Sequence, residues 1–315
     1  MEGNEELLRL LGLPVFDDAR GLAELMHLDE RIVALFARHA SKGWYYRIYE
    51  IPKRSGGKRE IMQPGRRLKA IQAWVLRHIL DRLSVSEYAT AFRRTHGLRS
   101  NVNPHLQNRF FLCLDIKEFF PSITFWQVRG IFGMVGYPRR AASLLANLCT
   151  CCGRLPQGGV ASPSLSNLVA SPLDANIAES IGAMNIVYTR YADDMTLSSN
   201  NPSALCYVRD VVERIVMRHG FQINEEKTRL LGPRCRCRVT GLVKSSSSPS
   251  FGIGRKKKRE IRAAMYNLMV KGRSAPEYPS EESLVGWLSF IRSVDRISWK
   301  QMDTYYRELL RAAGR

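Results

Sequence analysis

Three aspartates stand where apolar, strand-like runs end. Asp115 follows the run Phe110–Leu114, and the doublet Asp193-Asp194 lies between two β-prone runs. A carboxylate at the end of a hydrophobic strand is costly unless it is paired or bound to a metal. Carboxylate oxygens suit Mg²⁺, and two such ions can hold both oxygens of an in-line phosphoryl transfer. The alternative is a simple turn, which Asp-Asp often forms.

Two further segments favour the metal site over the simple turn. Residues 155–163 contain two glycines among small residues and lead into a helix start, so their backbone can approach a ligand closely. Phe120 lies five residues after Asp115, where a bulky ring can lie under a nucleotide sugar. Along the chain, a basic hairpin precedes these pieces, and the acidic hairpin and a basic end follow them. This order indicates a site for a nucleotide and metal ions.

The elements that must position these residues follow from hydrophobic periodicity. Residues 44–63 are β-prone on both sides of a basic, glycine-containing tip, so we expect a hairpin there. Residues 162–181 are expected to form one long helix opened by a Ser-Pro pair. The other expected elements are strands at 110–116, 186–191 and 195–198, helices within 1–42, at 66–83, 125–149 and 204–219, a Ser-rich loop at 245–250, and helices from 255 and from 283.

The charge of the chain points to a polyanionic partner. Its 315 residues include 48 Lys and Arg against 29 Asp and Glu, a net charge of +19. Nucleic acid is the first candidate and an anionic membrane the second. The membrane is disfavoured because no apolar run approaches the roughly 20 residues of a span, and no secretory signal opens the chain, so we expect a cytoplasmic protein. Residues 230–315 hold 18 basic and 7 acidic residues, which suggests a boundary near 230–240.

Seven cysteines fall into no disulfide framework, which indicates reduced thiols in a cytosol. One interpretation of the cluster Cys149, Cys151 and Cys152 and of the pair Cys235 and Cys237 is zinc binding. The other is that they are small buried apolar residues and part of a basic strand. Zinc pairs usually stand two to four residues apart, and no histidine accompanies these, so we favour the second interpretation.

Taken together, the motifs resemble those of a reverse transcriptase. Asp115 matches the first carboxylate motif, residues 155–163 match the template and nucleotide loop, and Tyr191-Ala192-Asp193-Asp194 matches the Y-x-D-D box. The resemblance covers roughly residues 40–245, with the motifs in the right order.

Within that group the chain is similar to a bacterial retron reverse transcriptase. Residues 101–105 resemble the retron N-A-x-x-H element, with Val102 in place of alanine, and residues 239–241 match the retron V-T-G element. The resemblance implies an α+β, right-hand polymerase fold. It divides the chain into an N-terminal helical segment, fingers, a palm with an antiparallel catalytic sheet and a small, basic, helical thumb, with part of 140–185 packing between fingers and palm. The implied ranges are 1–42, 43–109, 110–240 and 241–315.

The resemblance also implies roles for single residues. Asp115, Asp193 and Asp194, helped by the Ile116 carbonyl, would ligate two Mg²⁺, for which Mn²⁺ can substitute. Lys227 would protonate the pyrophosphate that leaves. The alternative for Lys227 is a solvated lysine at the end of an element.

Five residues would hold the incoming nucleotide. Lys53, Lys58 and Arg59 in the hairpin would bind its triphosphate, and Arg59 is favoured because its planar fork suits phosphate. Phe120 would strike a ribose 2′-OH, so that deoxynucleotides are preferred. Gln157 would contact the nucleotide directly.

A further group would bind RNA or the duplex. His105 suits structural support as well as it suits RNA contact, and the basic run that begins at Arg255 would be either a phosphate grip or a solvated face. The expected members of this group are Asn101, His105, Val239, Thr240, Gly241, Arg255, Lys256, Lys257, Lys258 and Arg259.

The function that the resemblance implies is RNA-directed DNA synthesis on a cognate structured non-coding RNA. Priming from the 2′-OH of a guanosine would give a branched RNA–DNA hybrid, msDNA, and dNTPs would be the substrates. An effector protein and a role in anti-phage defence in a bacterial cytoplasm are implied as well. The alternatives are another bacterial reverse transcriptase, of the intron or diversity-generating type, and a non-catalytic RNA-binding scaffold. The intact set of three aspartates argues against the scaffold.

Overall fold

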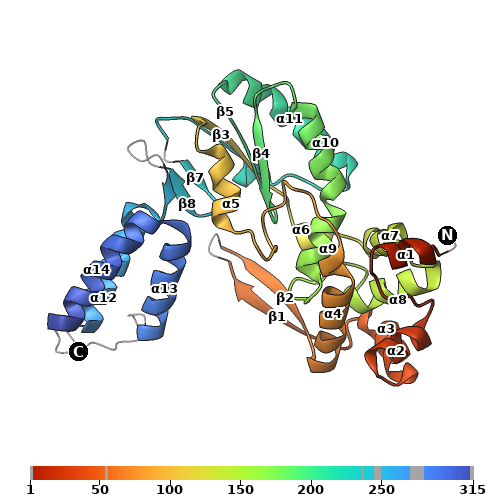
Figure 1. Cartoon of the computed structure of the whole chain (residues 1–315). Helices are drawn as coiled ribbons and strands as arrows, with labels where there is room; N and C mark the ends of the chain where they lie inside the picture. The colour runs from red at the N-terminus through yellow and green to blue at the C-terminus, as the bar shows by residue number, and fades with distance from the viewer. Residues whose placement is uncertain (1–2, 54–55, 236, 245–249, 270–279, 313–315) are drawn as a thin grey trace.

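The computed structural model describes residues 3–53, 56–235, 237–244, 250–269 and 280–312. Its centre is a four-stranded antiparallel sheet in the spatial order β4 (Val187–Tyr191), β5 (Asp194–Ser199), β3 (Phe110–Asp115) and β6 (Arg229–Leu231). Helix α11 (Pro202–Arg218) packs on β3 and β5, and α10 (Ser171–Ile181) packs against α11. The strands predicted in these regions are confirmed, and Figure 1 shows them at the middle of the molecule.

A two-stranded hairpin lies beside this sheet. Strands β1 (Tyr46–Pro52) and β2 (Lys58–Pro64) pair antiparallel, as predicted, and α4 (Arg66–His78) follows them. Two residues of the expected basic tip, 54 and 55, lie outside the described residues. The hairpin is held at its base by α4 and by the segment around Gln157, and Figure 1 shows it below the central sheet.

The N-terminal helices share one large hydrophobic core with the central sheet. Helix α3 packs against α8, and α7 packs against both α8 and α9. The helices predicted within 1–42 and at 125–149 are thereby confirmed, the latter as two. The bounds are α1 (Glu5–Leu10), α2 (Ala19–Met26), α3 (Glu30–Ala40), η1 (Leu80–Arg82), α5 (Leu98–Val102), η2 (Asn103–His105), α6 (Phe119–Ser122), α7 (Phe125–Met134), α8 (Arg139–Cys149), α9 (Ser162–Val169) and η3 (Glu225–Lys227).

The single helix predicted over 162–181 is wrong, because two helices occupy this range. Helix α9 ends at Val169, and α10 begins at Ser171 with Pro172 in its first turn. Proline has no backbone N–H, and its ring clashes with the carbonyl four residues earlier, so it starts a helix but does not continue one. After the break, α10 lies against β4, and Asp174 of α10 is buried there.

The C-terminal part forms a second, smaller core. A three-stranded sheet of β7 (Cys237–Val239), β8 (Leu242–Lys244) and β9 (Phe251–Gly252) packs with α12 (Gly254–Met269), α13 (Glu281–Val294) and α14 (Arg296–Ala312). Helices were expected from 255 and from 283, but α14 was not. Residues 245–249 of the expected Ser-rich loop lie outside the described residues. Phe111 of β3 belongs to this second core, which therefore adjoins the central sheet.

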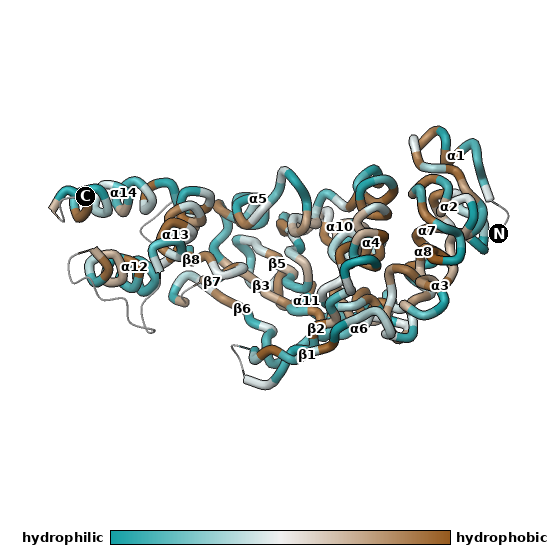
Figure 2. The backbone as a smooth tube through the Cα atoms, turned by 90° about the horizontal axis from the view of Figure 1, so that it is seen from below, coloured by the Kyte–Doolittle hydropathy of each residue, from teal (hydrophilic) through white to brown (hydrophobic). Residues whose placement is uncertain are grey.

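The molecule is elongated, with α12–α14 at one end and α1–α3 at the other (Figure 2). Among the residues that the structure describes, no helix combines the length and the apolar character needed to cross a bilayer. All seven cysteines are free thiols, and Cys149, Cys151 and Cys237 are buried. These three therefore act as small apolar core residues.

Candidate active site

Strand register brings the three aspartates to one end of the central sheet. Asp115, the last residue of β3, pairs directly with Asp194, the first residue of β5. The backbone N–H of Ile116 donates to the Asp193 carbonyl at 2.9 Å, so the turn between β4 and β5 is tied to the end of β3. Ala192 in this turn is left-handed, with φ of 57°. The backbone therefore brings these three residues to the same end of the central sheet.

The carboxylates repel one another in a largely desolvated place. Burial raises the pKa of Asp194 to about 6, and the charges of Asp193 and Asp115 act in the same direction. Burial also raises the pKa of Asp193, and the charge of Asp115 adds to it. Since desolvation and like charges both disfavour the ionised form, three ionised carboxylates need a cation close by.

Lys227 is one such cation. Its Nζ donates to Asp115 Oδ2 at 2.8 Å, although the lysine side chain remains 48% exposed and the aspartate only 8%. Burial acts to lower the pKa of Lys227, but the hydrogen bond to Asp115 and the charges of all three aspartates outweigh it and raise the pKa. The Asn224 N–H donates to the Asp115 carbonyl at 2.8 Å and fixes the start of η3 against the site. Lys227 is thus held at the carboxylates by its bond to Asp115, unlike a freely solvated lysine.

The donor set fits Mg²⁺ that a substrate would help to hold. Within the described part of the chain, no three His, Cys, Asp or Glu side chains are arranged to hold a metal ion by themselves, and Asp115 is partly engaged by Lys227. Mg²⁺ in phosphoryl-transfer sites is usually bound by one or two carboxylates together with water and substrate phosphates. Hard carboxylate oxygens that lack enough positive charge match that pattern. The Ile116 carbonyl stays a predicted ligand.

Two predicted nucleotide contacts lie in segments outside the central sheet. Phe120 on α6 is half-buried, with its ring centroid 5.7 Å from Phe119 and 6.1 Å from Phe92. The Gln157 carbonyl accepts from the Met62 N–H at 2.8 Å, which ties the glycine-containing segment to β2. Gly158 has φ of +119°, and a Cβ there would approach Met62 O to 3.1 Å. Glycine is therefore required for this close approach.

The hairpin cations differ in their surroundings. The Lys58 Nζ lies 2.6 Å from a Glu50 carboxylate oxygen, so its charge is already paired. Arg59 is exposed, and its positive charge lowers the pKa of Asp193. Lys53 is exposed as well. Of these three, Arg59 is the one that acts on the carboxylates, which agrees with its choice as the favoured triphosphate ligand.

Direct RNA contact by His105 and Asn101 is contradicted by their burial. Both side chains are inaccessible to solvent. The ring nitrogens of His105 lie 2.6 Å from Ser198 Oγ and 2.8 Å from Thr189 Oγ1, which connects η2 to the sheet. Burial lowers the pKa of His105 to about 3, so the ring is neutral. Of the two alternatives for His105, structural support is the one that the structure favours.

The V-T-G segment lies on the same scaffold. Asn101 Nδ2 donates to Thr240 Oγ1 at 3.2 Å, so the two retron-like elements meet in space. Val239 is 2% exposed and belongs to the second core, which contradicts its predicted RNA contact. Thr240 and Gly241 form a left-handed turn with φ of 44° and 87°, and Gly241 is exposed. RNA contact therefore remains a prediction for the turn, and Val239 is structural.

The basic run on α12 is less uniform than the sequence suggests. Lys257 Nζ lies 3.3 Å from a Glu260 oxygen and 4.3 Å from the centre of the Trp287 ring. Lys258 Nζ lies 3.7 Å from an Asp295 oxygen. The other three members, Arg255, Lys256 and Arg259, are exposed.

A cavity of about 1180 Å³ opens between α12, the start of α14, β7–β9, the segment after β6 and the loop before β3. Among the residues that the structure describes, its wall is strongly basic and includes two acidic side chains, Glu260 and Asp295. Its basic members are Arg109, Arg234, Lys244, Arg255, Lys256, Lys258 and Arg259. The three exposed members of the basic run thus line a cationic cavity together with Lys258 and with Arg109, Arg234 and Lys244 from other parts of the chain.

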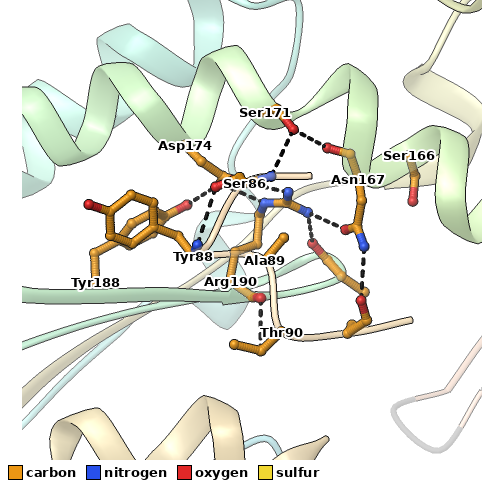
Figure 3. Close-up of polar contacts among 12 residues, drawn as sticks. Ser86, Tyr88, Ala89, Thr90, Ser166, Asn167, Ser171, Asp174, Tyr188 and Arg190 are labelled. Atoms are coloured by element: carbon orange, nitrogen blue, oxygen red, sulfur yellow. Dashed lines mark hydrogen bonds and ion pairs between the residues drawn. The ribbon is translucent and has the colours of Figure 1, made fainter. Parts of the chain in front are cut away.

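A buried ion pair behind the turn between β4 and β5 was not predicted from the sequence. Arg190 on β4 and Asp174 on α10 have no solvent exposure, and two Arg190 nitrogens lie 2.7 Å from the two Asp174 oxygens (Figure 3). An arginine inside a strand that is otherwise apolar was the available signal. Its partner could not be identified, because Asp174 lies in a helix segment with no motif of its own.

The chain is similar in sequence to known proteins over most of its length. The family model described as reverse transcriptase (RNA-dependent DNA polymerase) matches residues 51–246. The chain is 39% identical to the retron Ec86 reverse transcriptase of Escherichia coli, over 98% of this chain and 94% of that protein. It is 32% identical to the retron Mx65 reverse transcriptase of Myxococcus xanthus, over 93% and 72%. A solved telomerase structure from Candida albicans gives a TM-score of 0.48 at 11% identity, over 84% of this chain and 54% of that one, too low to carry an argument.

Proposed function

Because the chain belongs to the reverse transcriptases, and within them to the retron reverse transcriptases, we propose that this RNA-directed DNA polymerase copies part of its own structured RNA into msDNA. Synthesis would begin at the 2′-OH of a guanosine in that RNA and give a covalently branched RNA–DNA hybrid. The observation that carries the proposal is the pairing of Asp115 with Asp194 beside Asp193, with Lys227 on Asp115.

The carboxylates would hold two Mg²⁺ or Mn²⁺ ions. Asp115, Asp193 and Asp194 would be the ligands, with the Ile116 carbonyl. When bound, such ions stabilise charge on the attacking and leaving oxygens of an in-line phosphoryl transfer. Supporting this assignment, burial and mutual repulsion leave the carboxylates short of positive charge.

The surrounding residues would bind and orient the nucleotide. Arg59, with Lys53 and, after release from Glu50, Lys58, would hold the triphosphate above the carboxylates. Phe120 would exclude a 2′-OH, and Gln157 would contact the nucleotide from the segment fixed to β2. Lys227 Nζ, half exposed and protonated, would give its proton to the leaving pyrophosphate.

The cationic cavity would bind the structured RNA and its duplex with the new DNA. Three exposed cations of the α12 run line it, together with basic side chains from other parts of the chain. Phosphate contacts of this kind supply sequence-independent affinity. The fingers, palm and thumb would correspond to residues 43–109, 110–240 and 241–315, after a helical segment 1–42.

The biological setting is part of the proposal. The partners would be the cognate non-coding RNA, its msDNA product, dNTPs and an effector protein, in anti-phage defence within a bacterial cytoplasm. Its support is the family to which the chain belongs.

Two experiments test the proposal at different levels. Extension of a DNA primer on poly(rA) with dTTP tests polymerisation, with Asp193→Asn as the inactive control that still binds RNA. Activity of Asp193→Asn at the unmutated rate would refute the metal-ligand assignment. Sequencing the nucleic acid that copurifies with the protein tests the retron product. A branched hybrid with a DNA strand joined to a guanosine supports the proposal, whereas linear cDNA alone would indicate another reverse transcriptase type.

A further inference from the structure

The turn between β4 and β5, which carries Ala192 and Asp193 and which we call the catalytic turn, contacts a buried network of charged and polar side chains centred on Arg190. Its guanidinium binds both oxygens of Asp174 through Nε and Nη2 at 2.7 Å. Tyr188 OH donates to the same carboxylate at 2.8 Å. Figure 3 shows these side chains between the β4 strand and the α10 helix. Such burial of two charges is a weak source of stability, because desolvation offsets most of the attraction. The network therefore calls for a reason other than stability.

The third guanidinium nitrogen, Nη1, forms a hydrogen bond to the catalytic turn. Nη1 donates to the Ala192 carbonyl at 3.2 Å and to Asn167 Oδ1 at 3.2 Å. Ala192 is the left-handed residue directly before Asp193. A non-glycine residue in this region is held there by its surroundings. The bond from Arg190 is such a constraint, and it acts on the residue directly before Asp193, one of the proposed metal ligands.

The same guanidinium contacts two other parts of the site. Asn167 belongs to α9, which begins directly after the segment that carries Gln157. The Arg190 Cζ lies 5.8 Å from the centre of the Phe119 ring, and Phe119 packs against Phe120. One buried cation thus touches the catalytic turn, the helix behind the nucleotide segment and the neighbour of the predicted sugar gate.

We propose that Arg190 is a positioning residue for the polymerase reaction, anchored by Asp174, and that it sets the turn that aims Asp193 and Asp194. The inference rests on the polymerase activity. A planar fork is needed, because a lysine could keep the charge pair but could not bind Asp174 through two atoms while also reaching Ala192. A role limited to packing would instead be met by any pair of side chains that fills the same volume.

Three variants separate positioning from packing. The double variant Arg190→Met with Asp174→Leu removes both charges together, since one buried charge left alone would be strongly destabilising. Arg190→Lys keeps the charge pair. Thr189→Val is the matched control, because it removes a buried hydrogen bond to His105 from the same strand without touching the turn.

The measurements are thermal unfolding, RNA affinity, kcat and KM in primer extension, and Mn²⁺ binding. Mn²⁺ is titrated by electron paramagnetic resonance on the protein with template, a dideoxy-terminated primer and dNTP, so that no reaction occurs. Loss of outer contacts to metal ligands typically costs 10- to 100-fold in metal affinity or activity. We expect the double variant and Arg190→Lys to lose about that much in kcat and in Mn²⁺ affinity, with RNA affinity unchanged.

The outcomes are distinct. A folded double variant with the kcat and Mn²⁺ affinity of the unmutated protein would overturn the proposal. If the double variant does not fold, Arg190→Lys decides: unchanged kcat and Mn²⁺ affinity would overturn it, and a loss of both would support it. A loss of the same size in Thr189→Val would also overturn it, because the effect would then be a general one on the sheet. An unmutated protein that does not polymerise would refute the proposed function instead.

Discussion

Lys227 and Asp115 form an ion pair of 2.8 Å across the end of the central sheet, although 112 residues separate them in the chain. The lysine comes from η3 and the aspartate from the end of β3, and the bond from the Asn224 N–H to the Asp115 carbonyl holds the two segments together. The pair gives Lys227 two conceivable roles. It can neutralise Asp115 in the resting site, or it can supply a proton to the leaving group.

Substitution of Lys227 distinguishes these two roles. Lys227→Ala should lower kcat by about 10²- to 10⁴-fold, the usual range for loss of a general acid, and leave RNA affinity unchanged. Lys227→Arg keeps a positive charge beside Asp115 but does not release its proton. If Lys227 donates a proton, the arginine variant stays slow. Recovery of the unmutated kcat by Lys227→Arg, measured in primer extension, would limit Lys227 to charge neutralisation.

The raised pKa of Asp194 predicts opposite effects of pH on stability and on activity. The unfolded chain binds this proton only near pH 3.8, whereas the folded protein binds it near pH 6. Because the folded state holds more protons in this window, its stability rises as pH falls through it. Polymerisation should fall over the same range, since a protonated Asp194 is a poorer metal ligand.

Denaturant unfolding in EDTA at pH 7 and pH 5 tests the stability part, with Asp194→Asn as the control. The variant lacks the ionised carboxylate, so it should be more stable than the unmutated protein at pH 7. The difference in the free energy of unfolding between the two proteins should be smaller at pH 5. A difference that is the same at both pH values would show that Asp194 is not the group that titrates.

Replacement of Phe120 by valine should admit ribonucleotides. The smaller side chain leaves room for the 2′-OH, and steric discrimination in such pockets is roughly 10- to 200-fold. The measurement is the ratio of kcat/KM for rNTP to that for dNTP, with Phe120→Tyr as the variant that keeps the ring. Phe119 is buried, so an unchanged ratio in Phe120→Val would direct attention to the exposed Phe92, whose ring lies 6.1 Å away.

The sequence was sufficient for the parts of the site that are marked by local patterns. An acid after an apolar run predicts a strand end, which placed Asp115 correctly, and an acidic doublet between two β-prone runs placed Asp193 and Asp194 where β4 turns into β5. The pairing of Arg190 with Asp174 was beyond reach, because it depends on how α10 lies on the sheet after the break at Ala170. His105 was ambiguous for the same reason, since burial arises from tertiary packing and not from the local residues.

The basic run on α12 divides into two sets that predict different salt dependence. Arg255, Lys256 and Arg259 are exposed and line the cationic cavity, whereas Lys257 and Lys258, the second of which also lines the cavity, have acidic partners within the protein. A phosphate contact contributes roughly 0.7–0.9 to the slope of log K against log salt. Neutralising the exposed set with glutamine should therefore reduce the slope for structured RNA by about 2 to 3.

The paired set supplies the control for this prediction. Lys257→Gln with Lys258→Gln removes two positive charges from the same helix, against three in the exposed set, and these ammonium groups are engaged by Glu260 and Asp295. We expect this variant to change the slope by less than the roughly 0.7–0.9 that one phosphate contact contributes. Neither variant should change the rate of a single nucleotide addition at saturating template. Slope reductions in the ratio of the charges removed, three to two, would mean that binding responds to net charge alone. The exposed cations would then be a solvated face, and the duplex grip would have to lie elsewhere.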